Sequence, residues 1–144
     1  MNVDLIEKKI TKKTKAIIAV SLYGQPAEFK KINEIANKYS IPVVEDAAQS
    51  FGSKIGDKQA GSFGLIGTTS FFPAKPLGCY GDGGAIFTND DYLAQKIKMM
   101  VNHGEKIKYH HELIGCNSRL DSIQAEILNV KLKHLSEYNN NRGI

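Results

Sequence analysis

Cysteine is scarce in this sequence, and long hydrophobic runs are missing. The two cysteines, Cys79 and Cys116, lie too far apart to form a C-x-x-C metal or redox motif, so we interpret them as reduced thiols. No apolar run approaches the roughly 20 residues of a membrane-spanning helix. The residues after Met1 lack the charged-then-apolar pattern of a signal peptide. We therefore predict a cytoplasmic protein with no membrane partner.

Tryptophan is absent, and the aromatic residues do not alternate with the basic ones. Five lysines gather near the start, at positions 8, 9, 12, 13 and 15, as on the solvated face of a helix. Because this pattern is not typical of a nucleic-acid interface, we expect no nucleic-acid partner. The 144 residues, 42% hydrophobic and 24% charged, suit one modest domain, and the net charge of +4 suits an anionic ligand such as a nucleotide diphosphate.

Hydrophobic patterning predicts strands that alternate with helices. Buried-type strands are expected at residues 15–20, 41–45, 68–72 and 85–88. Apolar residues at helical spacing from Phe29 to Tyr39 predict a helix that covers one face of the sheet. A strand–helix–strand unit of this kind connects as a right-handed parallel crossover. We therefore predict an α/β fold with a mostly parallel sheet flanked by helices.

The other segments carry weaker signals. We expect a helix over residues 3–14, an irregular glycine-rich stretch over 47–67 and a polar loop over 103–117. Asn89 or Asp90 can cap a helix that continues to Met100. A last helix is expected over 120–135, with an apolar side formed by Ile123, Ile127, Val130 and Leu135. Both ends look abrupt, which predicts the middle of a larger protein.

Three residues have the chemistry of a pyridoxal phosphate site. Asp46 ends a predicted strand, and ligands of open α/β sheets bind beyond the carboxyl ends of strands. Lys75 lies between Pro73 and Pro76, which restrict the backbone, and Ser70 precedes it at a strand end. This cofactor needs a lysine for a Schiff base, an acid beside its pyridinium nitrogen and donors for its phosphate. A buried Asp46, Lys75 and Ser70 supply these three groups.

Each of these residues also has an ordinary interpretation. Asp46 suits a turn or a helix cap. Lys75 could be an ordinary surface lysine, although the apolar neighbours of Lys75 argue against a solvated position. Ser70 suits a hydrogen bond to backbone, and Gln49 a solvated loop. Asn117 or Ser118 suits a helix cap, and Arg119 suits a surface ion pair. His103, His110 and His111 have no carboxylate or cysteine at ligand spacing, so we expect loop histidines and no metal.

Four motifs together resemble the DegT/DnrJ/EryC1/StrS family of aminotransferases. They read VEDAAQSFG at 44–52, TSFFPAKPLG at 69–78, GDGGA at 81–85 and GCNSRLD at 115–121. The resemblance implies the aspartate aminotransferase fold (PLP fold type I) and pyridoxal 5'-phosphate as cofactor. Family members are more than twice this length. Residues 1–144 would then be the central part of the cofactor-binding large domain, with the N-terminal segment and the C-terminal small domain absent.

The same resemblance implies a role for each candidate residue. Lys75 matches the lysine that bonds to the cofactor and then moves a proton. Asp46 matches the acid on the pyridine nitrogen, Gln49 the glutamine beside the ring, and Ser70 the hydroxyl on the phosphate. Asn117 matches the asparagine that reaches the phosphate in the neighbouring subunit, which implies a homodimer. Arg119 lies near that crossing point and receives no role.

The implied activity is transamination of a nucleotide-linked keto sugar. The stretch 72–91 is most similar to enzymes that aminate the 3-keto group of a UDP-linked 2-acetamido hexuronate, in surface polysaccharide or glycan precursor biosynthesis. Glutamate would be the amino donor and 2-oxoglutarate its product. The alternative is a catalytically silent truncated piece of such an enzyme. A simple nucleotide-binding module is disfavoured, because no G-x-G-x-x-G follows the strand that ends at Val20.

Overall fold

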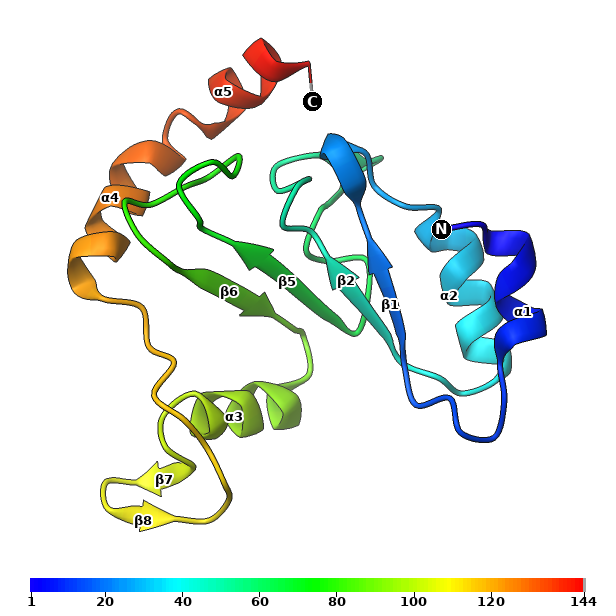
Figure 1. Cartoon of the computed structure of the whole chain (residues 1–144), viewed down its shortest axis with the longest axis horizontal. Coiled ribbons are helices and arrows are strands. Elements are labelled where there is room, and N and C mark those ends of the chain that lie inside the picture. Colours follow the sequence, from blue (N-terminus) through cyan, green and yellow to red (C-terminus); the bar gives the residue numbers. More distant parts are fainter. Residues whose placement is uncertain (144) are drawn as a thin grey trace.

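The computed structural model describes residues 1–143 and places a four-stranded sheet at the centre of the molecule (Figure 1). The strands lie in the order β1 (Ile17–Val20), β2 (Val43–Asp46), β5 (Ile66–Ser70) and β6 (Gly84–Phe87). β1, β2 and β5 are parallel, whereas β6 is antiparallel to β5. The predicted α/β fold with a mostly parallel sheet is confirmed.

One face of the sheet is covered by helix α2 (Phe29–Lys38), which connects β1 to β2. Side chains of a strand alternate between the two faces, and the register puts Ala19 and Val43 on the covered face. Phe29 and Ile32 of α2 pack in the same core, and each contributes about 1.5–3 kcal/mol through burial. The predicted helix and the parallel connection of β1 to β2 through it are thus confirmed.

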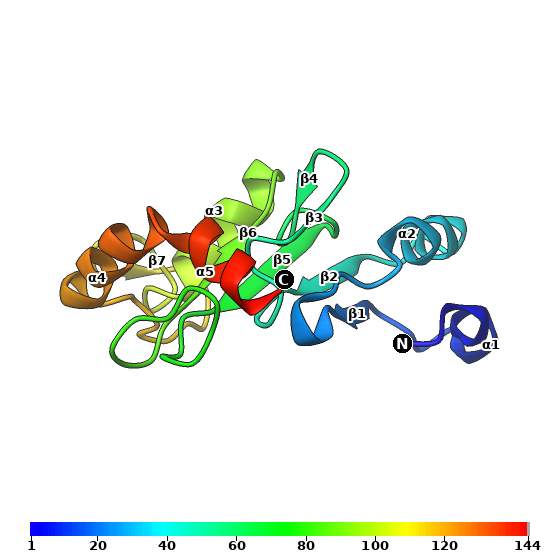
Figure 2. The same ribbon diagram turned by 90° about the horizontal axis from the view of Figure 1, so that it is seen from above.

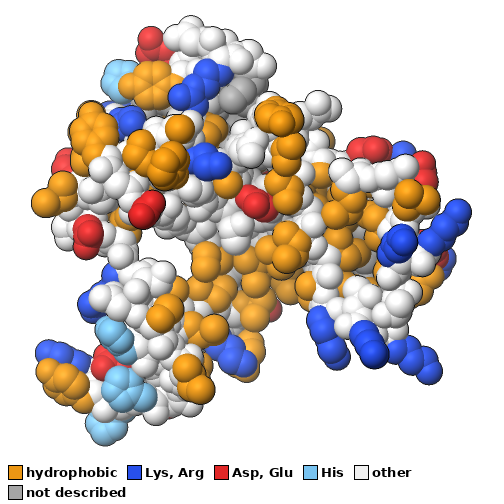
Figure 3. Space-filling model, viewed as in Figure 1, with side chains coloured by type: hydrophobic (Ala, Val, Ile, Leu, Met, Phe, Trp, Pro, Cys, Tyr) orange, Lys and Arg blue, Asp and Glu red, His pale blue; other side chains and the backbone are white. Residues whose placement is uncertain are grey.

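The other face of the sheet is open over much of its area. Ile18 in β1 is 60% exposed and Ile86 in β6 is 48% exposed, although both side chains are apolar. The register puts Val44 and Ile66 on this same face, between them. Figure 3 shows hydrophobic side chains gathered over the middle of the molecule in the view of Figure 1. Within residues 1–143, helix α2 therefore covers only one of the two faces.

The segment between β2 and β5 folds onto the covered face. It contains a small hairpin of β3 (Lys54–Ile55) and β4 (Lys58–Gln59), where the sequence predicted irregular structure. The hairpin lies on the side of the sheet where α2 lies (Figure 2). Gly67 in β5 meets this segment closely, since a Cβ there would lie 2.0 Å from the carbonyl oxygen of Gly61. Only glycine allows this approach.

Glu45 anchors that segment from inside the sheet. Its side chain is completely buried, and its two carboxylate oxygens accept hydrogen bonds from the backbone N–H groups of Gly61 and Phe63, each 2.8 Å long. Burial raises the pKa of Glu45 above its ordinary value, and the two backbone hydrogen bonds partly offset that shift. The side chain of Glu45 therefore joins β2 to the segment that crosses the covered face.

Helix α3 (Asp91–Met100) follows β6 and begins as predicted. Asp90 is its N-cap, and its Oδ1 accepts a 2.9 Å hydrogen bond from the N–H of Leu93. The predicted polar loop after α3 is wrong in one part, where β7 (Glu105–Ile107) and β8 (His110–His111) form a hairpin. The sequence lacks the usual signal of a hairpin turn, because Tyr109 and not glycine takes the left-handed conformation, with φ of 69°.

The chain ends in two helices where one was predicted, α4 (Ser122–Leu132) and α5 (Leu135–Arg142). Leu128 of α4 is buried in a second core cluster. Ile123 and Val130, predicted on the buried side, are 74% and 55% exposed. Apolar residues occur on several sides of α4, so periodicity could not identify the side that packs. The N-cap of α4 is Asp121 and not Asn117.

At the start of the chain the predicted helix is shorter than expected. A 3-10 turn η1 (Val3–Leu5) leads into α1 (Ile6–Lys9), and the chain then turns before β1. Lys38 and Tyr39, at the end of α2, both donate hydrogen bonds to the carboxylate of Glu7 and lower its pKa. Among the helices of residues 1–143, none has the length and apolarity to cross a membrane.

Candidate active site

Asp46 and Ser70 lie on the same face of the sheet, at the same edge. Each is the last residue of its strand, β2 and β5, and these strands are parallel neighbours. The register pairs Asp46 with Thr68, and Ser70 follows Thr68 by two residues, which brings its side chain back to the same face. The face is the open one. The structure therefore brings two predicted site residues together at the edge where α/β sheets bind ligands.

The carboxylate of Asp46 is half-buried and held by a local turn. Its Oδ1 accepts a 3.0 Å hydrogen bond from the N–H of Ala48. The sequence predicted a buried acid at this strand end, but the fully buried acid is its neighbour Glu45, which faces the covered side. Strand alternation explains the difference. Asp46 is the acid that remains available to a ligand on the open face.

Ser70 and Gln49 each make one contact with the backbone. The Ser70 hydroxyl oxygen accepts a 3.2 Å hydrogen bond from the N–H of Phe72, so its proton can be donated elsewhere. The Gln49 side-chain oxygen accepts a 3.1 Å hydrogen bond from the N–H of Tyr23, in the turn η2 (Leu22–Gly24) that follows β1. That contact orients Gln49 so that its side-chain NH₂ is the group it can offer a ligand.

Lys75 lies in the loop of residues 71–83 that joins β5 to β6. Figure 2 shows this green loop projecting from the sheet on the side opposite to β3 and β4, which is the open side. The Lys75 N–H donates to the carbonyl oxygen of Phe72 at 2.9 Å, and the side chain is half-buried. Leu77 and Cys79 anchor the loop in the second core cluster. The proline-flanked lysine is thus held on a short, anchored loop.

Helix α4 binds the same loop through two polar side chains that sequence reasoning missed. The Gln124 side-chain oxygen accepts a 2.8 Å hydrogen bond from the N–H of Tyr80. The Lys131 ammonium group donates to the carbonyl oxygen of Gly78 and lies 5.4 Å from the ring centroid of Tyr80. Gln124, Leu128 and Lys131 have the i, i+4, i+7 spacing of one helix face, which was the available signal.

Asn117 and Arg119 lie away from this group. Asn117 forms an isolated β-bridge with Asn102, which follows α3 closely, and its side-chain oxygen accepts a 3.1 Å hydrogen bond from Nε of Arg119. Arg119 also donates to the Asn102 side chain at 3.2 Å. Helix α3 lies at the lower edge of the sheet in Figure 1, whereas β1, β2 and β5 end at the upper edge. No ion pair of Arg119 occurs among the described residues, and its interpretation as a surface ion pair is replaced by these amide contacts.

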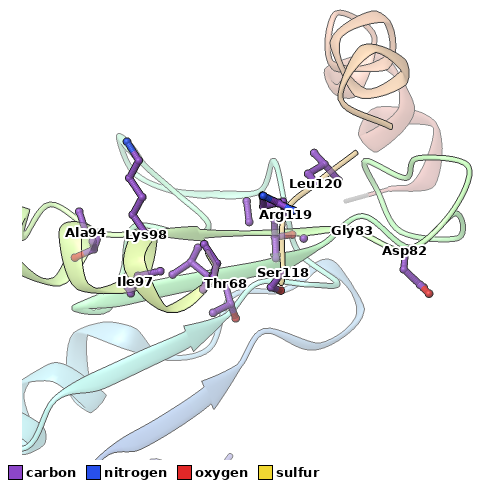
Figure 4. A pocket seen from close by; sticks show the side chains of 15 residues that line it. Thr68, Asp82, Gly83, Ala94, Ile97, Lys98, Ser118, Arg119 and Leu120 are labelled. Carbon is purple, nitrogen blue, oxygen red and sulfur yellow. The ribbon is translucent and has the colours of Figure 1, made fainter. Parts of the chain in front are cut away.

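A cavity of about 760 Å³ lies between β5, β6, α3 and the segment 118–120 (Figure 4). Thr68, Lys98 and Arg119 contribute to its wall, whereas Asp46, Gln49, Ser70 and Lys75 do not. Asp46 and Ser70 instead end their strands at the upper edge of the sheet, and Gln49 and Lys75 lie in the segments that follow these strands. Within residues 1–143, no cluster of three or more His, Cys, Asp or Glu side chains could hold a metal ion.

Taken together, the upper edge offers an acid, a hydroxyl donor, an amide and a primary amine. These groups come from three successive segments, after β2, at the end of β5 and in the loop that follows it. Such a set can bind a protonated heterocycle and a phosphate beside a nucleophilic amine.

The sequence model of the "DegT/DnrJ/EryC1/StrS aminotransferase family" matches residues 1–143. A curated relative from Pseudomonas aeruginosa, "UDP-2-acetamido-2-deoxy-3-oxo-D-glucuronate aminotransferase", is 59% identical over 133 residues, 92% of this chain and 37% of the relative. From Streptomyces venezuelae, "dTDP-3-amino-3,4,6-trideoxy-alpha-D-glucose transaminase" is 44% identical over 139 residues, 96% of this chain and 37% of the relative. The chain thus spans somewhat over a third of the length of these relatives.

Two solved structures share the fold of this chain. A Streptomyces venezuelae protein in complex with a ketimine intermediate superposes with a TM-score of 0.91 at 43% identity, over 95% of this chain and 37% of that one. A Brucella abortus aminotransferase of the same family gives 0.83 at 49% identity, over 85% of this chain and 33% of that one. The predicted PLP fold type I is thereby confirmed.

Proposed function

Because the chain belongs to the DegT/DnrJ/EryC1/StrS aminotransferase family, we propose that it carries the central part of a pyridoxal phosphate site for transamination of a nucleotide-linked keto sugar. The observation that carries the proposal is the placement of Asp46 and Ser70 on one open face, at one sheet edge, next to the Lys75 loop. Residues 1–144 are then the middle of the large domain of a longer enzyme.

The residues at this edge fit that cofactor. Asp46 can pair with the protonated ring nitrogen, because its carboxylate is half-buried and faces the open side. Ser70 can donate its proton to the phosphate, and Gln49 can donate its amide hydrogens to the ring hydroxyl. Bound there, pyridoxal phosphate would supply the aldehyde that takes up an amine and the ring that stabilises negative charge on the adjacent carbon.

The protein's own chemistry then centres on Lys75. Its amine is the nucleophile that would hold the cofactor's aldehyde, and it is the base that would accept and return a proton at the reacting carbon. Two prolines restrict the loop backbone, which reduces the entropy lost in placing the amine. With the cofactor bound, the negative charge of Asp46 would favour the protonated form of the ring nitrogen. Transamination moves the amino group of a donor onto the keto sugar and leaves the donor as a 2-oxo acid.

For the substrate we propose a UDP-linked 3-keto hexuronate, with glutamate as donor and 2-oxoglutarate as its product. The 59% identity to the Pseudomonas aeruginosa enzyme, whose name specifies a UDP-linked 3-oxo-glucuronate, supports this choice over other keto sugars. The product would serve surface polysaccharide or glycan precursor biosynthesis in the cytoplasm. Comparison of glutamate with other amino donors, at equal concentrations, tests the donor.

Asn117 enters the proposal through a second subunit. Asn117 forms a β-bridge with Asn102 beyond the end of α3, and among the described residues no hydrogen bond joins its side chain to Asp46, Ser70 or Lys75. We propose that it reaches the phosphate in the neighbouring subunit of a homodimer. The alternative to an active enzyme is a catalytically silent piece, which is favoured by the open sheet face.

The proposal is tested by titrating the chain with pyridoxal phosphate and recording absorbance. We expect a band of the lysine–cofactor adduct that borohydride reduction fixes on the peptide containing Lys75. The exposed lysines of the same chain, mapped in the same digest, serve as internal controls. Label spread evenly over all lysines would contradict a specific site and favour the silent piece.

Replacing Asp46 with asparagine is expected to weaken cofactor binding about 30-fold. The change removes a charge partner of the ring nitrogen, a loss of about 2 kcal/mol, at the lower end for charge pairs because Asp46 is only half-buried. The Kd from the absorbance titration measures the effect. Asp57→Asn, an exposed aspartate between β3 and β4, is the matched control and should bind like the parent chain.

A further inference from the structure

Helix α4 contacts the loop of residues 71–83, here called the lysine loop, at two backbone positions that follow Lys75 in the sequence. Gln124 accepts from the N–H of Tyr80 at 2.8 Å, and Lys131 donates to the carbonyl oxygen of Gly78. Gly78 in turn lies against the loop's first arm, since a Cβ there would lie 2.4 Å from the carbonyl oxygen of Pro73. The position of Lys75 between these two arms thus depends on where α4 lies.

Helix α5 makes an equivalent contact with the turn that follows Asp46. Asn139 is buried, and its side-chain N–H donates to the carbonyl oxygen of Phe51 at 3.1 Å. Leu135 lies against Gly52, and Phe51 and Leu135 both pack on the core cluster that anchors the lysine loop. One pair of consecutive helices therefore contacts both segments of the candidate site.

We propose that α4 and α5 fix the Lys75 loop relative to the Asp46 turn, and that Gln124 and Lys131 are positioning residues for Lys75. The inference deepens the proposed function and rests on it for the role of Lys75. It goes beyond simple packing, because Leu128 already supplies the apolar contact of α4. Gln124 and Lys131 add polar contacts to loop backbone, and Lys131 also lies over the Tyr80 ring. Ordering such long side chains costs rotamer entropy.

The contact itself is tested by amide hydrogen exchange at Tyr80. Gln124→Met has a similar shape but no acceptor, and we expect it to speed exchange of the Tyr80 N–H about tenfold. Gln124→Glu keeps an acceptor and should restore slow exchange. Gln95→Met, at an exposed position of α3, is the matched control. Unchanged exchange at Tyr80 in Gln124→Met would overturn the inference.

Positioning is tested by the reactivity of Lys75. In Gln124→Met we expect borohydride trapping of pyridoxal phosphate at Lys75 to slow about tenfold, because the amine is no longer held beside the other groups. Labelling of the same amine by acetic anhydride should speed up, because the half-buried side chain gains exposure. Because a loss of stability would produce the same two changes, urea unfolding of each variant gives its folded fraction, and both labelling rates are compared at equal folded fraction. Gln124→Glu should reverse both changes.

The outcomes separate this inference from the proposed function. If the parent chain shows no specific cofactor label at Lys75, the proposed function fails, while Tyr80 exchange and acetic anhydride labelling still decide the positioning claim. Faster Tyr80 exchange with unchanged labelling of Lys75 would overturn that claim. If Gln124→Met does not fold, Lys131→Met is used with Lys131→Arg as its rescue, since arginine can still donate to Gly78.

Discussion

Replacing Lys75 with alanine is expected to abolish the covalent cofactor band and all borohydride-stable label on its peptide. Under the proposed function, the label forms on a primary amine in the loop that follows Ser70. No other lysine follows one of the strands that end at the upper sheet edge as closely as Lys75, which is five residues beyond Ser70. Absorbance spectra and peptide mapping of the reduced complex measure the effect.

A second variant tests whether the label depends on the nucleophilic amine of Lys75 or only on its positive charge. Lys75→Arg keeps a positive side chain of similar length, but the guanidinium stays protonated and cannot act as the nucleophile. We expect it to lose the label as completely as Lys75→Ala. Lys30→Ala, at an exposed position of α2, should behave like the parent chain. Full label on another lysine in both Lys75 variants would show that the site lies elsewhere.

The sequence predicted the elements that its local signals define. Phe29, Ile32 and Ala36 recur at helical spacing, and they are the side chains that α2 buries. The sequence predicted Asn89 or Asp90 as the N-cap of α3, and Asp90 is the N-cap in the structure. The strand that ends at Asp46 was placed correctly because continuous apolar runs are typical of parallel strands. Such signals act over a few residues and need no tertiary information.

What the sequence could not predict depends on contacts between distant residues. Glu45 and Asp46 are adjacent acids, and which one is buried depends on the side of the sheet that residues 61–63 cover. The contact of Gln124 with Tyr80 joins residues 44 positions apart. The spacing of Gln124, Leu128 and Lys131 indicates a common helix face, but it does not identify Tyr80 as the partner. The role of Asn117 requires a second subunit and stays a prediction.

Glu45 gives the largest expected effect on stability. Glu45→Ala removes the acceptor of two buried N–H groups, those of Gly61 and Phe63, and opens a cavity in the sheet. At about 1–3 kcal/mol for each unpaired group, we expect the free energy of unfolding to fall by about 3–5 kcal/mol. Urea unfolding measures the change. Glu34→Ala, at an exposed position of α2, should change it by less than about 0.5 kcal/mol.

The pH dependence gives a second, independent test of the same side chain. Burial raises the folded-state pKa of Glu45 above its ordinary value of 4.5, so the folded chain keeps this proton at pH values where the unfolded chain has lost it. Its contribution to stability therefore declines as pH rises above 4.5, and becomes constant above the folded-state pKa. Glu45→Gln cannot titrate and should lack this decline.

The quantity to compare is the unfolding free energy of the parent chain minus that of Glu45→Gln. We expect this difference to be largest near pH 4.5 and to shrink as pH rises. Taking the difference cancels the titration of the other acids, which both chains share. Glu34→Gln, which is exposed, should run parallel to the parent chain at every pH. If the difference instead grew with pH, the two N–H donors would outweigh burial, and Glu45 would be held as a stabilised carboxylate.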